Sequence, residues 1–412
     1  MVKQLDTHYD IIIAGGGMIG TSLGLALAPL NLRIAIVEPV ARSSAEQPSF
    51  DDRSTALSRS SQRMFEAMGL WPEIVATATP IKTIHISDKG RFGFSHIEAE
   101  EQNVEALGYV VINRVLGEVL QRNLRTFSGI DVICPASVTG FSLSKRQAAV
   151  LIDKEGNERE LTCSLLVAAD GVKSGVRDMM GISATHIDYK QSAIIGNILT
   201  EKAHNNFAFE RFTEDGPLAV LPLVDDRSAF VWINPTGKTD ELLELPDKDF
   251  QLELQAAFGN RLGQFSTVGK RYAYPLSHTR TCGLTSRRGV VVGNAAHGLH
   301  PVAAQGFNLG LRDVAALCDC IAESRDRGEQ NFVTNSMLEA YSAWRKEDQA
   351  KLVHFTHGIV KLFGDKRPSI RLLRDMGMIG FDLLPGVRKL FAKHTMGLAG
   401  RLPRLCRGVP LA

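Results

Sequence analysis

Short runs of apolar residues, each ended by a glycine or an acidic residue, recur along the chain. Such runs are typical of parallel strands that are buried on both faces by covering helices. They are too short to be core helices of ordinary length. The runs are Tyr9–Ala14, Arg33–Glu38, Leu165–Ala169 and Gly289–Val292. The pattern predicts an α/β fold built on a mostly parallel sheet.

Two stretches between these runs follow a different pattern. Ile84–Ser87 and Ala229–Ile233 have the composition of antiparallel strands, and from Leu338 onward the apolar residues recur at helical spacing. A second domain inserted between pieces of the first explains this order. We predict a discontinuous first domain of residues 1–75, 100–182 and 277–337, an inserted antiparallel-sheet domain of 76–99 and 183–276, and a C-terminal helical region of 338–412.

The first predicted strand runs into the segment Gly-Gly-Gly-Met-Ile-Gly, which the helical stretch Thr21–Ala28 follows. In this G-x-G-x-x-G arrangement, Gly15 permits a tight turn and Gly17 lets the backbone approach a pyrophosphate. Gly20 lets the helix pack closely on the strand. The helix N-terminus presents free N–H groups and the positive end of its dipole to phosphates. The motif predicts a dinucleotide site; a glycine-rich turn without a ligand is the alternative.

Glu38 ends the second predicted strand, at the distance from the glycines that this fingerprint requires. A carboxylate there can accept hydrogen bonds from ribose hydroxyls. It would repel a 2′-phosphate, so NADP is disfavoured as the ligand of this loop. NAD and FAD both remain compatible with it.

Two later segments bear on which dinucleotide binds. Asp170–Arg177 follows the third predicted strand, and Gly293–His297 follows the fourth and leads to Gln305–Gly310 at the start of a helical stretch. The order G-x-G-x-x-G…E, D-G-x-x-S-x-x-R and G-N-A-A-H-x-x-x-P…G-x-N resembles that of the single-component aromatic-ring flavin monooxygenases. The resemblance spans nearly the whole chain and uses motifs that lie far apart in the sequence, which favours FAD.

The resemblance implies a Rossmann-like FAD-binding domain of the aromatic hydroxylase type with an inserted substrate domain. In that family the middle motif contacts both FAD and the passing nicotinamide. The third motif holds the ribityl chain and pyrophosphate, and the helix after it points its N-terminus at the flavin. Beyond the first loop and Glu38, the residues implied to bind FAD are Arg53, Arg114, Asp170, Gly293, Asn294, Gly306, Phe307 and Asn308.

The activity implied by the resemblance is aromatic-ring hydroxylation. NAD(P)H reduces FAD, O₂ adds at the flavin C4a carbon, and the resulting hydroperoxide transfers an oxygen to an electron-rich ring. The N–H groups of residues 306–308 could stabilise the negative edge of the reduced flavin. No second G-x-G-x-x-G motif is present for NAD(P)H, which is consistent with transient binding of the nicotinamide.

A general base would help this reaction because a phenolate is more nucleophilic than a phenol. The sequence does not assign one. His297 in the third motif is a weak catalytic candidate, and a structural role is an equal alternative. His300 is interpreted as a loop residue. Tyr189, Tyr272 and Tyr274 are interpreted as core or surface tyrosines.

Within the family, the chain most resembles the ubiquinone-biosynthesis hydroxylases, on the segments Asp51–Leu57, Thr79–Ile81 and Gln305–Asp313. Asn294 stands where the family usually has Asp, and this resembles the branch that acts on 2-polyprenyl-6-methoxyphenol. The implied reaction forms the 1,4-benzoquinol, with O₂ as co-substrate and a ubiquinone-biosynthesis complex as partner. A hydroxylase of a soluble aromatic compound and a non-catalytic FAD-binding assembly subunit are the alternatives.

The composition limits the kinds of partner and ligand that the protein is expected to bind. The 412 residues carry a net charge of +2, which argues against a nucleic-acid partner, and six cysteines without zinc spacing predict buried thiols and no metal site. No signal sequence or long apolar run occurs, so we expect a cytoplasmic protein.

The C-terminal tail is more basic than the rest of the chain. From Lys361 onward there are eleven Lys or Arg and three Asp or Glu. Leu383–Leu405 mixes apolar and basic residues, which suits peripheral contact with the inner face of a membrane. An ordinary amphipathic helix docked on the first domain is the alternative.

Overall fold

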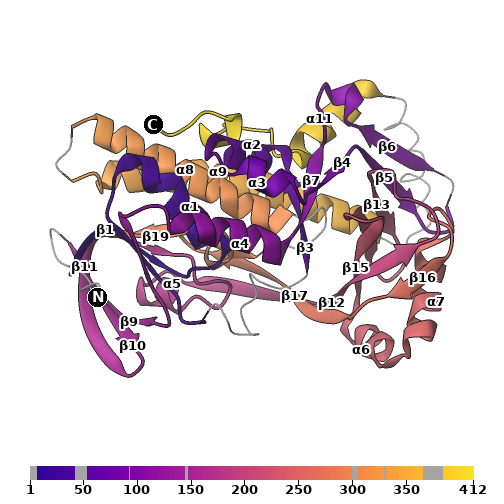
Figure 1. The fold of residues 1–412 in the computed structure, drawn as a ribbon, viewed down its shortest axis with the longest axis horizontal. Coiled ribbons are helices and arrows are strands. Elements are labelled where there is room, and N and C mark those ends of the chain that lie inside the picture. The colour runs from indigo at the N-terminus through magenta and orange to yellow at the C-terminus, as the bar shows by residue number, and fades with distance from the viewer. Residues whose placement is uncertain are drawn as a thin grey trace.

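The computed structural model describes residues 7–41, 53–91, 93–143, 147–298, 305–328, 331–364 and 384–412. Their strands form three sheets of eight, nine and three strands. Figure 1 shows the first sheet on the left, the second on the right, and long helices running across the first. Sequence positions 42–52 and 299–304, which include His300 and part of the Asp51–Leu57 segment, lie outside the described residues.

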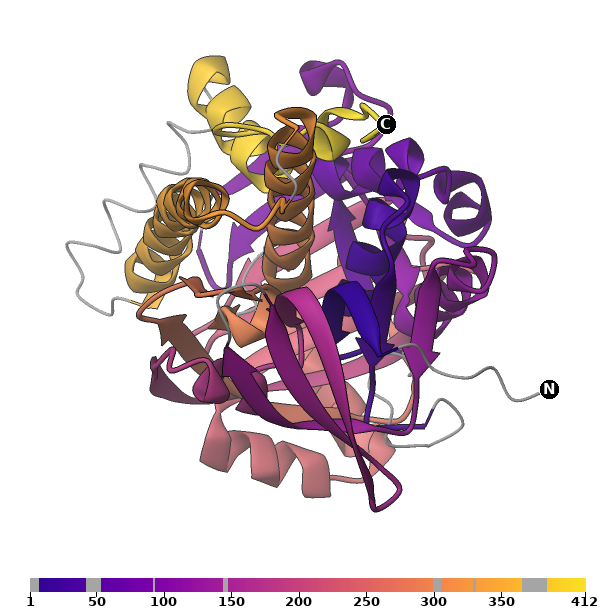
Figure 2. The same ribbon diagram turned by 90° about the vertical axis from the view of Figure 1, so that its left-hand side faces the viewer.

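The first sheet contains all four predicted parallel strands, and the predicted α/β fold class is confirmed. Strand β1 lies between β11 and β2 and is parallel to both, and β19 is parallel to β11. In spatial order the strands are β18 (Thr285–Ser286), β19 (Gly289–Val291), β11 (Asn157–Ala168), β1 (His8–Ala14), β2 (Ile34–Val37) and β8 (Ile130–Ile133), with β10 (Ala148–Lys154) and β9 (Ser137–Leu143) added antiparallel beyond β11. Figure 2 shows the hairpin of β9 and β10 projecting from the sheet.

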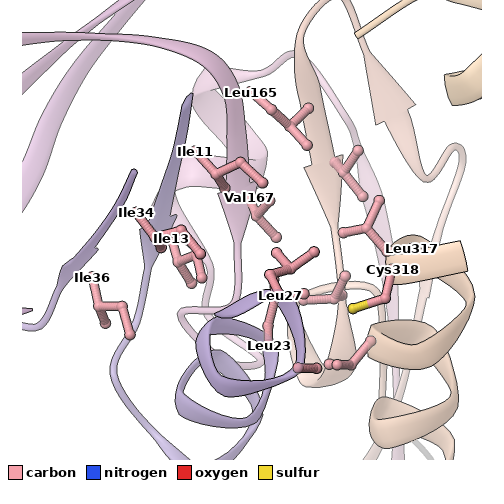
Figure 3. Close-up of a cluster of buried hydrophobic side chains, with 14 of the residues drawn as sticks. Ile11, Ile13, Leu23, Leu27, Ile34, Ile36, Leu165, Val167, Leu317 and Cys318 are labelled. Carbon is pink, nitrogen blue, oxygen red and sulfur yellow. The ribbon is translucent and has the colours of Figure 1, made fainter. Parts of the chain in front are cut away.

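Apolar helices cover this sheet. Fully buried isoleucines of β1 and β2 pack against Leu23 and Leu27 of α1 (Met18–Leu27), and Leu317 and Cys318 of α8 (Gln305–Asp326) pack beside them (Figure 3). Each such aliphatic side chain contributes about 1.5–3 kcal/mol on burial. The other helices of this half are α2 (Arg59–Ala67), α3 (Trp71–Val75), α4 (Asn113–Leu124), α5 (Gly175–Met179) and α9 (Asn335–Gly364), with short 3₁₀ turns η1 (Ala28–Leu30), η3 (Glu100–Gln102) and η4 (Gly293–Ala295).

The second sheet is antiparallel as predicted, except that β13 and β5 run parallel. One of its faces packs on α6 (Thr236–Glu244) and α7 (Asp247–Phe258), where Phe230 and Trp232 meet Phe250 in a separate core. In spatial order the strands are β20 (His297–Gly298), β17 (Tyr272–Thr281), β12 (Ala184–Thr200), β15 (Arg227–Pro235), β14 (Pro217–Pro222), β13 (Phe207–Phe212), β5 (Thr83–Asp88) and β6 (Phe94–Glu98), with β16 (Phe265–Val268) paired to β12.

A third, small sheet joins the two halves and was not predicted. Its strands are β3 (Ser54–Ser58), β7 (Gly108–Ile112) and β4 (Thr79–Ile81). A buried cluster combines Ile81 and Val110 of this sheet with Ala208 and Ala229 of the second sheet. The predicted domain ranges remain a prediction. Strand β4 lies in the range assigned to the inserted domain, but it pairs with β7, which lies in the range assigned to the first domain.

The described parts of the C-terminal region are helical, with α11 (Pro385–Thr395) and the short turn η6 (Leu405–Arg407), and positions 365–383 lie outside the described residues. Tyr341, Trp344 and Cys406 are part of the core of the first sheet, whereas Ala392 packs in a separate cluster with Ile97 of β6. The described C-terminal chain therefore packs against both the first and the second sheet.

All six cysteines are free, but the expectation that they are buried is wrong for Cys282, which is exposed.

Candidate functional site

The loop between β1 and α1 leaves no room for side chains. Gly15 has a φ of +103°, and a Cβ there would lie 2.4 Å from the carbonyl oxygen of Ala169. A Cβ on Gly20 would lie 1.9 Å from the carbonyl oxygen of Gly15. Gly17 is the N-cap of α1, and its carbonyl accepts a hydrogen bond from the Thr21 N–H at 2.9 Å. The sequence therefore requires glycine here for close packing of loop, strand and helix.

Glu38 follows β2 and lies beside this loop. Its carboxylate accepts hydrogen bonds from the Gly16 N–H at 2.6 Å and from the Val40 N–H at 2.9 Å. A Cβ on Gly16 would lie 2.9 Å from the Cβ of Glu38. The structure thus brings the predicted acid and the glycine loop together.

The middle motif follows β11. Asp170 accepts hydrogen bonds from the Ser174 hydroxyl and, at 3.2 Å, from the Val176 N–H. Ser174 caps α5 by accepting from the Arg177 N–H at 3.0 Å. The buried Arg177 guanidinium donates to the Ala295 carbonyl at 3.3 Å. These bonds tie the middle motif to the third one.

The third motif follows β19. Gly293 has a φ of +59°, and its N–H donates to Asp313 at 2.9 Å, while Asn294 is exposed on η4. At the start of α8, no described residue lies within 4 Å of the position that a Cβ on Gly306 would take, and Phe307 is partly buried against the first core. Asp313, farther along α8, holds the loop at Gly293 in place.

Asn308 uses its side chain to join α8 to β3 and α2. Its oxygen accepts from the Ser58 N–H at 2.8 Å and from the Ser61 hydroxyl at 2.7 Å. Its amide donates to the Ala56 carbonyl at 2.9 Å. The side chain therefore positions the start of the helix.

His297 belongs to a buried ion network. Its Nε2 lies 2.6 Å from Asp313 Oδ2, and Arg345 Nε donates to Asp313 Oδ1 at 2.7 Å. Asp348 accepts from both Arg345 and Arg312. Burial alone would raise the pKa of Asp313, but the charges of His297 and Arg345 lower it to about 2. The contacts give His297 a structural partner.

The two predicted arginines lie in different surroundings. The Arg53 guanidinium lies over the ring of Tyr274, 4.6 Å from its centroid, and so bridges the first residues of β3 and the second sheet. Arg114 on α4 is half-exposed and pairs with Glu118 at 3.3 Å. The structure places Arg53 at the junction of the two halves.

These loops share one edge of the first sheet, and that edge suits an extended dinucleotide. Strands β19, β11, β1 and β2 are neighbours and parallel, so the segments beginning at Gly293, Asp170 and Gly15 and the residue Glu38 all follow carboxyl ends at the same edge. Ligands of open α/β sheets bind in the crevice at this edge. The glycine cradle fits a pyrophosphate, and no cluster of metal-binding side chains occurs among the described residues.

Comparison with known proteins agrees with this geometry. The family described as "FAD binding domain" matches residues 8–356. Ubiquinone hydroxylase UbiL of Rhodospirillum rubrum is 32% identical over 98% of this chain and 94% of its own. The 3-demethoxyubiquinol 3-hydroxylase of Escherichia coli is 28% identical over 94% of this chain and 98% of its own. The chain belongs to this family of FAD-dependent aromatic hydroxylases.

The fold of this flavin hydroxylase is also that of a solved enzyme. The p-nitrophenol 4-monooxygenase PnpA from Pseudomonas putida superimposes with a TM-score of 0.80, at 15% identity, over 96% of this chain and 100% of its own. At that identity the likeness concerns the fold. It agrees with the predicted combination of a nucleotide-binding sheet and an antiparallel sheet.

Two features of the site were not predicted. One is the network of Asp313, Arg345 and Asp348, for which the signal was the charged Arg345 in the stretch predicted to be an apolar-faced helix. The other is a cavity of about 310 Å³ between α8, α9 and α11. Its lining is mixed, because it contains Arg312, Asp348 and Lys351 as well as Leu309 and Leu390.

Proposed function

We propose that this hydroxylase acts on the ring of a polyprenylated phenol in ubiquinone biosynthesis, converting 2-polyprenyl-6-methoxyphenol to the 1,4-benzoquinol. The observation that carries the proposal is near full-length similarity to proteins named as ubiquinone hydroxylases. Asn294, at the position where the family usually has Asp, supports the specific branch. The hydroxylated carbon is the one para to the phenol oxygen.

The cofactor-binding residues are assigned from the shared edge of the first sheet. The loop from Gly15 to Gly20 holds the pyrophosphate, and Glu38 accepts from the ribose of the adenine end. Asp170, Gly293 and Asn294 lie along the ribityl side, with Arg53 and Arg114 as further FAD contacts. The flavin end would lie at the start of α8, where no described residue lies within 4 Å of a Cβ position on Gly306 and a ring could approach closely.

Bound FAD supplies the activation of O₂, with NAD(P)H as the source of electrons. The protein's part is to bind, orient and exclude water. Backbone N–H groups of residues 306–308 stabilise negative charge that develops on the flavin. Since the Asn308 side chain is bonded to β3 and α2, its contribution to the flavin comes from the backbone. His297 acts by holding the third motif through Asp313.

The catalytic assignment is tested with the purified holoenzyme, a short-chain prenylated methoxyphenol, NAD(P)H and O₂. The expected result is a ring product one oxygen heavier, found by mass spectrometry, with little turnover of soluble phenols. Preference for a soluble phenol would favour the alternative hydroxylase. Absence of NAD(P)H oxidation with every aromatic would favour an assembly subunit.

The position in the pathway is tested in cells that lack the gene. We expect the methoxyphenol to accumulate. Accumulation of a demethoxylated or already hydroxylated intermediate would contradict the specific step while leaving FAD-dependent hydroxylation intact.

A membrane contact through α11 fits a lipid-tailed substrate. Leu384, Val387 and Leu390 are 56%, 47% and 60% exposed, and Lys389 and Lys393 lie beside them. Exposed leucines among lysines match the interface of an anionic bilayer. Among the described residues, no helix is both long enough and apolar enough to span a membrane. The contact would therefore be interfacial.

Vesicle binding tests this contact. Leu390→Asp should lower co-sedimentation with vesicles containing anionic lipid by roughly tenfold, because it removes an apolar group that would enter the bilayer and adds charge repulsion. The control Leu252→Asp changes a leucine that is 58% exposed on α7, in the other half of the molecule. Equal binding of the two variants would contradict the proposal.

A further inference from the structure

Glu210 lies in β13, between Ile86 of β5 and Ala219 of β14. Side chains alternate along a strand, and the preceding Phe209 packs against Phe258 of α7 at a ring distance of 5.4 Å. Glu210 therefore points to the opposite side, away from α6 and α7. We call this side the inner face and define it by Ala208, Glu210, Ala219, Val231 and Tyr274.

The inner face is turned toward the proposed flavin site. Ala208, two residues from Glu210 on the same face, packs in the cluster that contains Ile81 and Val110 and borders Ala56. The carbonyl of Ala56 accepts the hydrogen bond from Asn308 at the start of α8. Glu210 lies about 7 Å along β13 from Ala208, given the rise of a strand.

A second contact lies on the same face, several strands away. The ring of Tyr274 on β17 faces the guanidinium of Arg53, which precedes β3. Between this contact and the one at Ala208, the face carries Ala219 of β14 and the partly buried Val231 of β15. Small and apolar side chains beside one carboxylate are the composition of a pocket for an aromatic ring with a single polar substituent.

Within the described residues, the carboxylate of Glu210 makes no hydrogen bond and no ion pair, whereas the buried Asp319 pairs with Arg404 at 3.1 Å. The residue keeps partial access to solvent. Burial raises its pKa to about 7, and burial is the only cause of this shift. A buried carboxyl group without a partner costs stability and needs a reason.

We propose that Glu210 is the general base that accepts the proton of the substrate's phenol. This rests on the proposed function. The phenolic O–H bond breaks, the proton goes to a carboxylate oxygen of Glu210, and the electron pair stays on the phenol oxygen and enters the ring. The carbons ortho and para to that oxygen become more nucleophilic toward the oxygen that O₂ supplies at the flavin. The proton afterwards leaves through the solvent-accessible side of the residue.

Other titratable and charged groups of the elements around the inner face do not take this role. They are Asp88 of β5, Tyr189 of β12, Tyr272 and Tyr274 of β17, Arg53, and Lys393 and His394 of α11. None of them contributes to the raised pKa of Glu210. Among the residues that define the inner face, Glu210 is the only carboxylate.

Glu210→Gln tests the proposal through the rate and its pH dependence. Hydroxylation should fall by about 10²–10⁴-fold, while NAD(P)H-dependent reduction of FAD continues and H₂O₂ forms instead of product. The wild-type rate should decline as the pH falls below about 7, and the variant should lack this limb. The control is Glu241→Gln, an exposed carboxylate on α6, which should behave as the wild type.

A phenol that is already ionised at the assay pH, such as a polyfluorinated analogue, should restore much of the lost rate in Glu210→Gln, because it needs no base. Failure of this rescue, or a variant with an unchanged pH limb, would overturn the assignment. A wild-type enzyme that hydroxylates no prenylated phenol would instead overturn the proposed function.

Ligand binding gives a readout without turnover, measured by calorimetry on the oxidised holoenzyme. A phenol donates to the ionised Glu210, so its affinity should rise as the pH increases through about 7. Its methyl ether can only accept, so its affinity should rise as the pH decreases. Both dependences should be flat in Glu210→Gln. Parallel dependences of the two ligands in the wild type would contradict the proposal.

Discussion

Two carboxylates of this protein, the fully buried Asp313 in the first half and the partly buried Glu210 in the second, have opposite surroundings. Asp313 is contacted by His297 and Arg345 and accepts from the Gly293 N–H, and its pKa is lowered to about 2 against the penalty of burial. Glu210 has no such contact, and burial raises its pKa to about 7. One carboxylate is held charged, and the other is close to a balance of its two forms at neutral pH.

The difference separates structure from chemistry. A buried charge with several partners fixes the loop that it contacts, and losing a partner is costly. A buried carboxyl group without partners stabilises nothing, but it can exchange a proton near neutral pH. Both lie near the proposed flavin site, so proximity alone does not identify the base.

The largest expected effect comes from removing Arg345, the arginine that pairs with the buried Asp313. Arg345→Met should lower the free energy of unfolding by about 3–5 kcal/mol, because it leaves Asp313 charged and buried with fewer partners. Urea unfolding of the holoenzyme measures this. The control Lys351→Met removes an exposed pair with Glu347 and should leave the midpoint nearly unchanged. A loss below about 1 kcal/mol for Arg345→Met would show that the network is not a structural element.

The second expected effect, that of Glu210→Gln, is a gain in stability. The folded-state pKa of Glu210, about 7, lies above its ordinary value of 4.5. The native state then binds the proton of Glu210 more tightly than the unfolded state does. The contribution of this residue to the free energy of unfolding is therefore fully present below pH 4.5 and is lost as the pH rises through 7. Glu210→Gln, which cannot ionise, should be more stable than the wild type at pH 8 by roughly 1–3 kcal/mol.

This gain should vanish below about pH 4.5, where the wild-type residue is protonated in both states. Asp313 behaves in the opposite way: its stabilisation is present above its ordinary value of 3.8 and is lost as the pH falls through 2. A Glu210→Gln variant that is less stable than the wild type at pH 8 would mean that the carboxylate has a partner in solution.

The sequence predicted the first half of the molecule better than the second, and the reason is physical. The loop at Gly15, the acid at Glu38 and the strands between helices follow from local spacing, because a glycine cradle and buried parallel strands have short-range patterns. The antiparallel character of the second sheet was also predicted. The third sheet was not, since β3, β4 and β7 are short and pair across long intervals.

Glu210 could not be predicted because nothing in its neighbouring residues marks it. Its importance depends on the facing of β13, on its cross-strand neighbours Ile86 and Ala219, and on the absence of a partner, which are all tertiary properties. His297 was singled out because it lies in a recognisable motif. A position in a motif shows that a residue is needed there, but the contacts of its side chain determine its role.

The smallest expected effect separates His297 from Glu210 directly. In His297→Gln, the amide nitrogen can still donate to Asp313, since Gln reaches about as far as the Nε2 of the ring. We expect bound FAD to be retained and hydroxylation to fall by much less than the roughly 10²–10⁴-fold loss expected for a general base. The decline of the rate below about pH 7 should remain, because the group that titrates is Glu210. If the decline below about pH 7 disappears in His297→Gln and persists in Glu210→Gln, the general base is His297. The network around Asp313, and not Glu210, would then contain the group that accepts the proton.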